Sequence, residues 1–240
     1  MSARPEFIAR DVDVVPAAAL IAEPTRAAMI TALLDDRPLA AGELARIAGV
    51  SPATASAHLA RLLNGGLVTM IKQGRHRYYH LAGPEVAAAM EALAHLSHGT
   101  PVQVRSLRES RDAAALAEAR TCYDHLAGRA GVALLEALLA QGILTPVRPD
   151  AFEVTADGMA TLTSFGLNIG ALEKTRRRFA GACLDWTERK PHLNGALGAA
   201  VTARLLGLGW IERGTRRRAV RVTPAGRDGL AATFGWSLEG

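Results

Sequence analysis

Two short segments of the sequence place a thiol near an imidazole. Cys122 lies three residues before His125, Cys183 lies nine residues before His192, and the chain has no other cysteine. Both cysteines begin a C-x-D sequence. Thiolate and imidazole are the ligands that soft metal ions prefer, and the thiols alone could bind arsenite or form a redox switch. These four residues are our candidates for metal or thiol sensing, with a soft metal ion or a metalloid as the candidate cofactor.

A structural role for the two cysteines is the alternative. Each lies among apolar residues, and a free cysteine is commonly a small buried side chain of the core. The unequal spacing to the two histidines is what we expect if one thiol is recruited across an interface. A shared metal site or a disulfide switch requires the two sulfur atoms to lie within about 10 Å of each other. Otherwise the signal is an organic ligand in the apolar interface between the repeats described next, or there is no ligand.

The segments that carry these residues belong to an internal repeat with a period near 67 residues. The matching pairs are HLAGRAG at 125–131 with HLNGALG at 192–198, 138–144 with 205–211, and 154–158 with 222–226. The repeat predicts two degenerate winged-helix units, each built as a helix, a wing-like hairpin and a helix. We expect residues 106–131 to be helical, and we expect the glycines of the repeated segment to let helices of the two units cross closely.

The first part of the chain has the pattern of a helix-turn-helix. Apolar residues at helical spacing predict a helix from about Pro24 to Leu34, and a short helix around Leu44 ends at Gly49. Ser51 is a typical N-cap, a proline occupies the first helical position after it, and the helix runs to Asn64 before a glycine pair. Two helices joined by a tight glycine turn form a helix-turn-helix.

A basic hairpin follows this second helix directly. Residues 67–72 and 77–81 are β-rich runs around the turn 73–76. A helix followed by a basic hairpin is the pattern of a winged helix, in which the helix enters the major groove and the wing reaches phosphates or the minor groove. The predicted DNA-binding residues are Ser51, Thr54, Ser56, Ala57, His58 and Arg61 on the helix, and Arg75, His76 and Arg77 on the wing.

Residues 20–98 resemble the ArsR family of bacterial winged-helix repressors. The matching stretches are LIAEPTRAAMITALL, ELARIAGVSPATASAHLARLLNGGLV and GRHRYYHL. The resemblance implies a homodimer joined by terminal helices, here around 17–22 and 84–97, and repression that a ligand relieves. Two departures concern the sites: Ala57 replaces a residue that is usually basic in the family, and the cysteines of the family's thiolate site are absent after Glu43 and Leu44.

Charge and composition limit the class of protein further. The formal net charge is +5, and basic residues cluster at 75–77, 176–178 and 216–218, which favours a polyanionic partner. No stretch approaches the roughly 18–20 apolar residues of a membrane span, and the N-terminal sequence lacks a signal-peptide core, so we expect a cytoplasmic protein with no membrane partner. We expect no enzyme, because the chain has no P-loop, no nucleophile elbow and no dinucleotide-binding glycine motif after a strand.

These patterns together predict a mostly α-helical α+β protein with small β-hairpin wings. Its predicted parts are a tail at 1–15, a winged helix-turn-helix at 16–100, and a domain at 101–240 for dimerisation and sensing, with repeat units at about 105–170 and 171–236. The 216–218 loop is a candidate accessory phosphate contact. The predicted function is a ligand-responsive repressor that binds a palindromic operator in double-stranded DNA as a homodimer and responds to a small-molecule or metal inducer. The alternatives are an architectural DNA-binding protein without an inducer and a winged-helix-fused enzyme.

Overall fold

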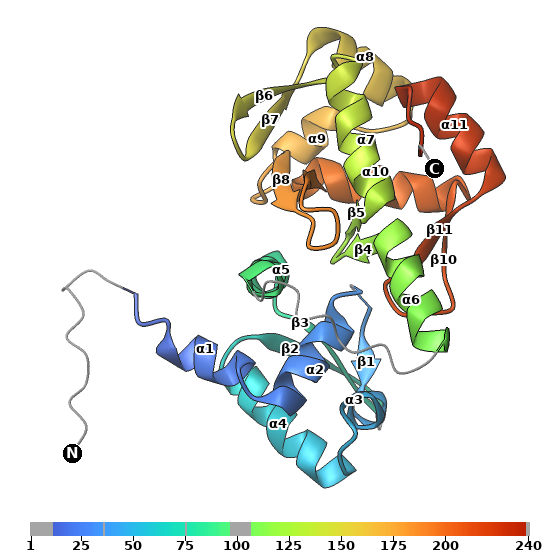
Figure 1. Ribbon diagram of the computed structural model, residues 1–240. Helices are drawn as coiled ribbons and strands as arrows, with labels where there is room; N and C mark the ends of the chain where they lie inside the picture. The colour runs from blue at the N-terminus through green and yellow to red at the C-terminus, as the bar shows by residue number, and fades with distance from the viewer. Residues whose placement is uncertain (1–11, 36, 75, 97–106, 239–240) are drawn as a thin grey trace. The chain divides into compact units, whose positions relative to one another are not determined.

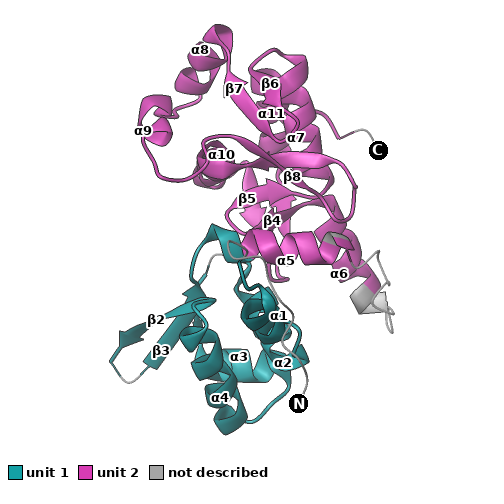
Figure 2. Ribbon diagram, turned by 90° about the vertical axis from the view of Figure 1, so that its left-hand side faces the viewer, with its two compact units in different colours: residues 1–86 teal, residues 87–240 magenta. Residues whose placement is uncertain are grey.

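The computed structural model describes residues 12–35, 37–74, 76–96 and 107–238, which divide into two compact units, Met1–Val86 and Ala87–Gly240 (Figures 1 and 2). The division falls inside helix α5 (Pro84–Leu96), earlier than the predicted boundary at residue 100. Among the described residues, none of the helices has both the length and the apolar character needed to cross a membrane.

The N-terminal unit is a helix-turn-helix followed by a hairpin. Its strands form one antiparallel sheet in the order β1-β3-β2, and β2 and β3 pair from Val68 opposite Leu81 to Gln73 opposite His76. The predicted winged helix-turn-helix is therefore confirmed. The elements before α5 are α1 (Val15–Ile21), α2 (Pro24–Leu33), β1 (Leu39–Ala40), α3 (Ala41–Ala48), α4 (Pro52–Asn64), β2 (Val68–Gln73) and β3 (His76–Leu81).

Local contacts fix the ends of these helices. The carboxylate of Glu23 accepts hydrogen bonds from the backbone of Thr25 and Arg26 and so caps α2. The buried guanidinium of Arg26 donates to the backbone oxygens of Leu20 and Ala19, which ties α1 to α2. The fully buried core of the unit contains Met29, Ile30, Leu33, Leu44, Leu59 and Leu62.

The C-terminal unit contains one sequence of elements twice: a helix, a hairpin, a helix, a second hairpin and a helix (Figure 1). The first set is α6 (Leu107–Glu118), β4 (Arg120–Cys122), β5 (His125–Ala127), α7 (Arg129–Ala140), β6 (Leu144–Arg148), β7 (Ala151–Val154) and α8 (Ala156–Ser164). The second set is α9 (Ile169–Glu173), β8 (Gly181–Leu184), β9 (Pro191–Asn194), α10 (Gly195–Gly207), β10 (Ile211–Arg213), β11 (Val220–Val222) and α11 (Pro224–Phe234).

The prediction of a continuous helix over 106–131 is wrong. Helix α6 ends at Glu118, and the β4–β5 hairpin separates it from α7. Gly128 therefore lies at the N-cap of α7 rather than inside a helix, with a φ of 74° that favours glycine. A Cβ there would also lie 2.7 Å from the carbonyl oxygen of Ala117, so the close approach of two backbones also requires glycine.

The two repeats cross at a second pair of equivalent glycines. A Cβ built on Gly131 would lie 2.3 Å from a carbonyl oxygen of its own repeat's hairpin and 3.6 Å from the Cβ of His192 in the other repeat. At Gly198 the corresponding distances are 2.6 Å and 3.3 Å, the latter to the Cβ of His125. Each helix therefore packs against the hairpin of the opposite repeat, β9 on α7 and β5 on α10.

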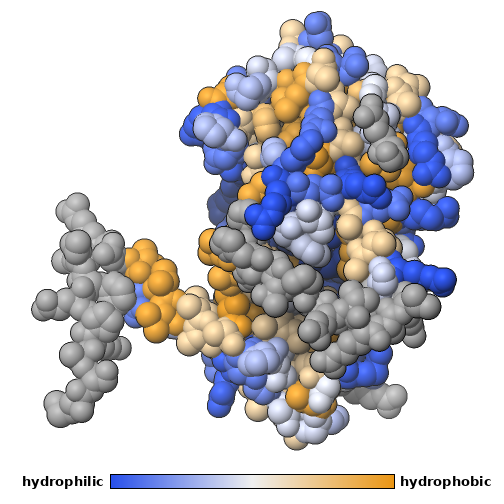
Figure 3. Space-filling view, in the orientation of Figure 1, coloured by the Kyte–Doolittle hydropathy of each residue, from blue (hydrophilic) through white to orange (hydrophobic). Residues whose placement is uncertain are grey.

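The core of the C-terminal unit lies between the two repeats. Strands β6, β7, β8 and β9 form one antiparallel sheet that joins them, while β4–β5 and β10–β11 are separate two-stranded sheets. Hydrophilic residues are spread over the visible surface of this unit, interrupted by smaller apolar areas (Figure 3). The most deeply buried apolar side chains of the unit include Leu138, Leu162, Leu197, Leu205, Leu230 and Phe234.

Candidate DNA-binding surface and metal centre

Helix α4 has one buried face and one exposed face. Ala55, Leu59 and Leu62 are fully buried and hold the helix on the rest of the N-terminal unit. Thr54 and Arg61 are exposed on the other face. Burial of two leucines fixes the helix, so the exposed side chains are presented by a rigid element, as base recognition in a major groove requires.

The hydroxyl groups of the predicted DNA-binding residues on α4 make hydrogen bonds within the helix itself. Ser51 Oγ accepts a hydrogen bond from the backbone of Thr54 at 3.2 Å and lies 2.9 Å from its Oγ1. Ser56 Oγ donates to the carbonyl oxygen of Pro52 at 2.9 Å. Ala57 is exposed and has no polar group. Ser51 therefore acts as the helix cap, and Arg61 is the long polar side chain on the exposed face.

His58 has a second contact that the sequence pattern does not reveal. Its Nδ1 lies 3.2 Å from Oε2 of Glu23, the carboxylate that caps α2, and its side chain is only 17% exposed. His58 thus links α4 to the start of α2, in addition to its predicted role in DNA binding.

Buried side chains on one face of β3 attach the wing to the rest of the N-terminal unit. Tyr79 and Leu81 are buried, whereas His76 and Arg77 are exposed near the tip of the hairpin. Arg75, the remaining predicted wing residue, lies outside the described residues. The exposed side chains of His76 and Arg77 are thus those of the predicted wing contacts that the structure describes.

Each candidate cysteine is the cross-strand partner of its histidine. Cys122 lies opposite His125 in the β4–β5 hairpin, and Cys183 lies opposite His192 in the β8–β9 hairpin. The different spacings in sequence reflect only the loops, a two-residue turn in the first repeat and a longer loop in the second. The unequal spacing does not single out one thiol as recruited across an interface. The two pairs are structurally equivalent, and their sulfur atoms meet between the repeats.

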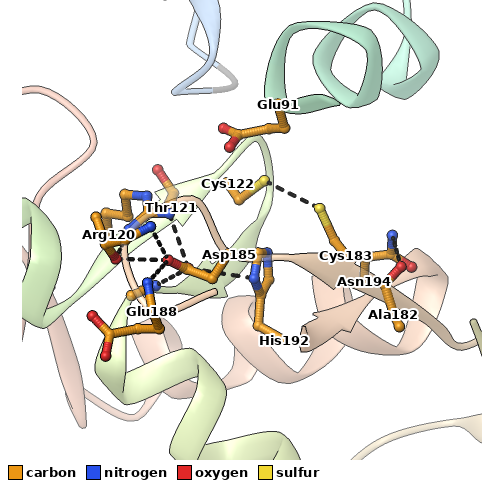
Figure 4. Close-up of polar contacts among 12 residues, drawn as sticks. Glu91, Arg120, Thr121, Cys122, Ala182, Cys183, Asp185, Glu188, His192 and Asn194 are labelled. Carbon is orange, nitrogen blue, oxygen red and sulfur yellow. Dashed lines mark hydrogen bonds and ion pairs between the residues drawn. The ribbon is translucent and has the colours of Figure 1, made fainter. Parts of the chain in front are cut away.

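The two hairpins meet and bring the four side chains together. The sulfur atoms of Cys122 and Cys183 are 4.0 Å apart, and their side chains point toward each other (Figure 4). The rings of His125 and His192 stack with centroids 5.1 Å apart. One potential ligand atom from each of the four residues lies within 4.8 Å of the others. The sulfurs are thus well inside the 10 Å limit set above for a shared site.

An aspartate lies beside each histidine. Oδ1 of Asp124 is 3.3 Å from Nδ1 of His125, and Oδ2 of Asp185 is 3.4 Å from Nδ1 of His192. Both histidines are buried, and their Nε2 atoms make no hydrogen bond within the described part of the chain. These aspartates are the third residues of the two C-x-D sequences. The sequence repeat therefore includes the carboxylate partner of each imidazole as well as the thiol.

Arginines compensate both aspartates. Arg177 makes a two-pronged contact with Asp124, and although burial opposes ionisation, this contact holds the pKa of Asp124 at about 2. Arg120 donates to Oδ2 of Asp185 at 2.9 Å, and both side chains are fully buried. Burial opposes ionisation there too, but the guanidinium holds the pKa of Asp185 well below its usual range.

The two thiols are not equivalent in charge. The hydrogen bond between them raises the pKa of Cys122, and burial raises it further. The same hydrogen bond lowers the pKa of Cys183, whose thiolate is also stabilised by His125 and His192. Cys183 is therefore the more acidic of the two thiols, and the thiolate is the form of cysteine that binds metal ions.

Comparison with known proteins identifies the chain. Residues 21–71 match the model of a helix-turn-helix domain. The chain is 42% identical over 208 residues to the "Uncharacterized HTH-type transcriptional regulator YdfF" of Bacillus subtilis (strain 168), with 87% of this chain and 91% of that protein covered. The chain belongs to the HTH-type transcriptional regulators. This regulator is a DNA-binding protein, and the alignment is long enough to extend into its C-terminal unit.

The regulator is also similar to solved structures over little more than a third of its length. One is HlyU from Vibrio cholerae N16961, at 34% identity, covering 35% of this chain and 89% of that one, with a TM-score of 0.33. Another is Mb0332 from Mycobacterium bovis, described as a homodimeric winged helix-turn-helix DNA-binding domain of a possible ArsR-family regulator. That match has 27% identity, covers 39% of this chain and 85% of that one, and has a TM-score of 0.34.

Two arginines of the regulator's candidate metal centre could not be predicted from the sequence. Arg120 and Arg177 contact carboxylates that lie 65 and 53 residues away in the chain. Neither belongs to a local motif that marks it as a partner of the cluster, although Arg177 falls within a basic run. Only the repeated C-x-D sequence pointed to this part of the network, through Asp124 and Asp185.

The basic loop at 216–218 is not a free phosphate-binding loop in the regulator. Arg216 pairs with Asp112 at 2.6 Å. Arg218 donates to the backbone oxygen of Thr121 at 3.0 Å and pairs with Glu91. Nearby carboxylates already compensate the charges of Arg216 and Arg218. This pairing disfavours the predicted accessory phosphate contact for these two side chains.

Proposed function

We propose that the regulator is a ligand-responsive repressor of the ArsR type that binds a palindromic operator as a homodimer. Helix α4 enters the major groove, and the hairpin of β2 and β3 contacts the adjacent backbone. The observation that carries this proposal is α4 itself. Ser51 caps it and Leu59 anchors it, while Arg61 stays exposed on the opposite face.

Exposed apolar side chains on the terminal helices support the homodimer. Val15 of α1 is 54% exposed, and Leu93 and Leu96 of α5 are 42% and 65% exposed. Helix α1 and residues 12–14 are visible at the left of Figure 3, where their surface is largely apolar. These helices are the ones that the family resemblance assigns to the dimer interface, so a second copy of the chain is the occupant we propose.

The buried Cys/His cluster supports the ligand response. A ligand changes DNA affinity only if it binds the DNA-bound and free forms with different affinities. A site inside the C-terminal unit, separate in sequence from the DNA-binding elements, allows such coupling without competition for the DNA surface. No part of this step requires catalysis.

Replacement of Arg61 by alanine should weaken operator binding about tenfold and relax sequence preference, because a base-contacting arginine contributes about 1–3 kcal/mol. Arg77→Ala should instead weaken binding to all sequences and reduce the slope of log affinity against log salt by about one. Fluorescence anisotropy with an operator selected from random DNA measures both quantities. The matched control is Arg148→Ala, which removes an exposed arginine of β6.

Equal operator affinities for the Arg61→Ala and Arg148→Ala variants would contradict the assignment of α4. Binding without sequence preference and with a steep salt dependence would instead support the architectural alternative.

Val15→Asp should shift the chain toward monomer at a concentration where the unmodified protein is dimeric, because a charge would be buried in the interface. Sedimentation equilibrium measures the change. Val147→Asp is the control, since this valine is 45% exposed on β6 and lies outside the proposed interface. Equal dissociation constants for the two variants would remove α1 from the interface.

A further inference from the structure

We propose that Cys122, His125, Cys183 and His192 bind one tetrahedral metal ion of the Zn²⁺ type. Its regulatory role rests on the proposed function above, whereas the binding itself rests only on the geometry of the C-terminal unit. Each repeat supplies one thiol and one imidazole from one hairpin, so the complete ligand set is Cys₂His₂.

The spacing of the side chains fits such an ion. Zn–S bonds of about 2.3 Å at a tetrahedral centre place two sulfur atoms about 3.8 Å apart. The sulfur atoms of Cys122 and Cys183 are 4.0 Å apart, and the four potential ligand atoms lie within 4.8 Å of one another. Small side-chain shifts would bring all four atoms to zinc-ligand distances of about 2.3 Å for sulfur and about 2.0–2.1 Å for nitrogen.

The histidines carry the strongest evidence. The side chain of His192 is fully buried and that of His125 is 7% exposed, yet neither Nε2 atom has a hydrogen-bond partner within the described residues. A core role leaves these buried nitrogens with only the sulfur of Cys183 as an electrostatic partner. Nδ1 of His125 is hydrogen bonded to Oδ1 of Asp124, and Oδ2 of Asp185 lies 3.4 Å from Nδ1 of His192 without a hydrogen bond. A carboxylate beside Nδ1 is the arrangement that orients a metal-binding imidazole with Nε2 toward the ion.

The charges of the surrounding groups also favour a divalent cation. Arg177 and Arg120 already compensate the two aspartates. Two thiolates and one Zn²⁺ then sum to zero within a buried site. Two buried thiolates without a cation would repel each other, so the fully deprotonated ligand set is stabilised by the ion.

A hydrogen-bond route leads from the cluster to α5. Arg218 donates to the backbone oxygen of Thr121, the residue before Cys122, and pairs with the buried carboxylate of Glu91 on α5. Figure 4 shows Glu91 extending from this helix above Cys122 in the view. Helix α5 belongs to the proposed dimer interface. Closure of the ligands around an ion would therefore act on α5 through Arg218 and Glu91, and so on the dimer that binds DNA.

The test is a titration of the metal-free, reduced full-length chain with Co²⁺ alone, without DNA. We expect one equivalent to produce thiolate-to-cobalt charge transfer and the visible absorption of a tetrahedral centre, and we expect one equivalent of Zn²⁺ to displace it. Cys122→Ser and Cys183→Ser should each lower Zn²⁺ affinity at least 100-fold. Asp124→Asn should lower it about 10- to 100-fold, as for other partners of metal-bound histidine. His80→Gln, a change at a histidine of the wing, is the matched control and should change nothing.

Circular dichroism and tryptophan emission of each metal-free variant show whether it is folded, and Asp124→Asn provides a test that leaves all four ligands in place. The proposal is overturned if folded variants bind Co²⁺ like the unmodified chain, if the cobalt spectrum is that of an octahedral site, or if the reduced chain fails to bind. Air oxidation to a Cys122–Cys183 disulfide, with a mass loss of two hydrogens, in a chain that binds no metal when reduced would likewise overturn it.

The regulatory part has its own readout. Glu91→Gln should bind Zn²⁺ as tightly as the unmodified chain within about threefold. The ratio of operator affinities with and without Zn²⁺ should fall to about one in this variant. A change that persists in Glu91→Gln contradicts the route through Glu91. An operator affinity that never depends on Zn²⁺ contradicts the regulatory role, and the cobalt titration still decides the metal site.

Discussion

Asp185→Asn is expected to lower the free energy of unfolding of the C-terminal unit by about 3–5 kcal/mol, the usual cost of removing one partner from a buried ion pair. Asp185 and Arg120 are both fully buried, so the variant leaves a guanidinium inside the protein without a compensating charge. The same carboxylate also accepts hydrogen bonds from the backbone of Gly128 and from Thr187, which join the start of α7 to the β8–β9 loop.

Tryptophan fluorescence during urea unfolding measures this change selectively. All three tryptophans, at 186, 210 and 236, belong to the C-terminal unit. The matched control is Glu212→Gln, which breaks a carboxylate–guanidinium pair with Arg221 whose side chains are 54% and 65% exposed. Exposed pairs contribute at most about 1 kcal/mol. A loss in Asp185→Asn no larger than that of the control would show that the pair is not buried in solution.

Gly131→Ala is expected to lower the free energy of unfolding of the C-terminal unit. Added volume in a tightly packed region costs about 1–3 kcal/mol, and we expect a loss at the upper end of this range. The new Cβ would lie 2.3 Å from the carbonyl oxygen of Leu126, and backbone atoms cannot move aside as a flexible side chain does. Relief requires α7 to shift from the hairpin that carries His125, so metal affinity should fall together with stability.

Gly207→Ala provides a control with the opposite sign. Gly207 is also helical, at the end of α10, but a Cβ there meets no atom within 4 Å. Alanine should stabilise the helix by up to about 1 kcal/mol, because glycine has the lower helix propensity. Destabilisation of equal size in both variants would mean that loss of glycine, rather than the close approach at Gly131, determines the result.

The DNA-binding unit could be predicted closely because its signals are local. The cap at Ser51, the glycine at 49 and the alternation of the hairpin strands each act within a few residues, and the structure ends α3 and begins α4 at the expected positions. The contact between His58 and Glu23 was not predictable, since it depends on how two helices pack rather than on either helix's own sequence.

In the C-terminal unit, the repeat could be found in the sequence, but the order of its elements was only partly predictable. The alanine-rich stretch before Cys122 favours helix, and the β4–β5 hairpin forms against this tendency because tertiary contacts bury Arg120 and Thr121. The four ligand candidates were recognised by residue type. Their equivalence became visible only when each cysteine was paired across a strand with its histidine.

The division of the cluster between two repeats of one polypeptide affects how its occupancy depends on protein concentration. A site shared by two subunits loses its ligand when dilution separates the subunits. Here β4–β5 and β8–β9 are covalently connected, so the effective concentration of one half-site at the other does not change with dilution. Metal occupancy would therefore follow free metal alone, and a scarce regulator could report the same metal level as an abundant one.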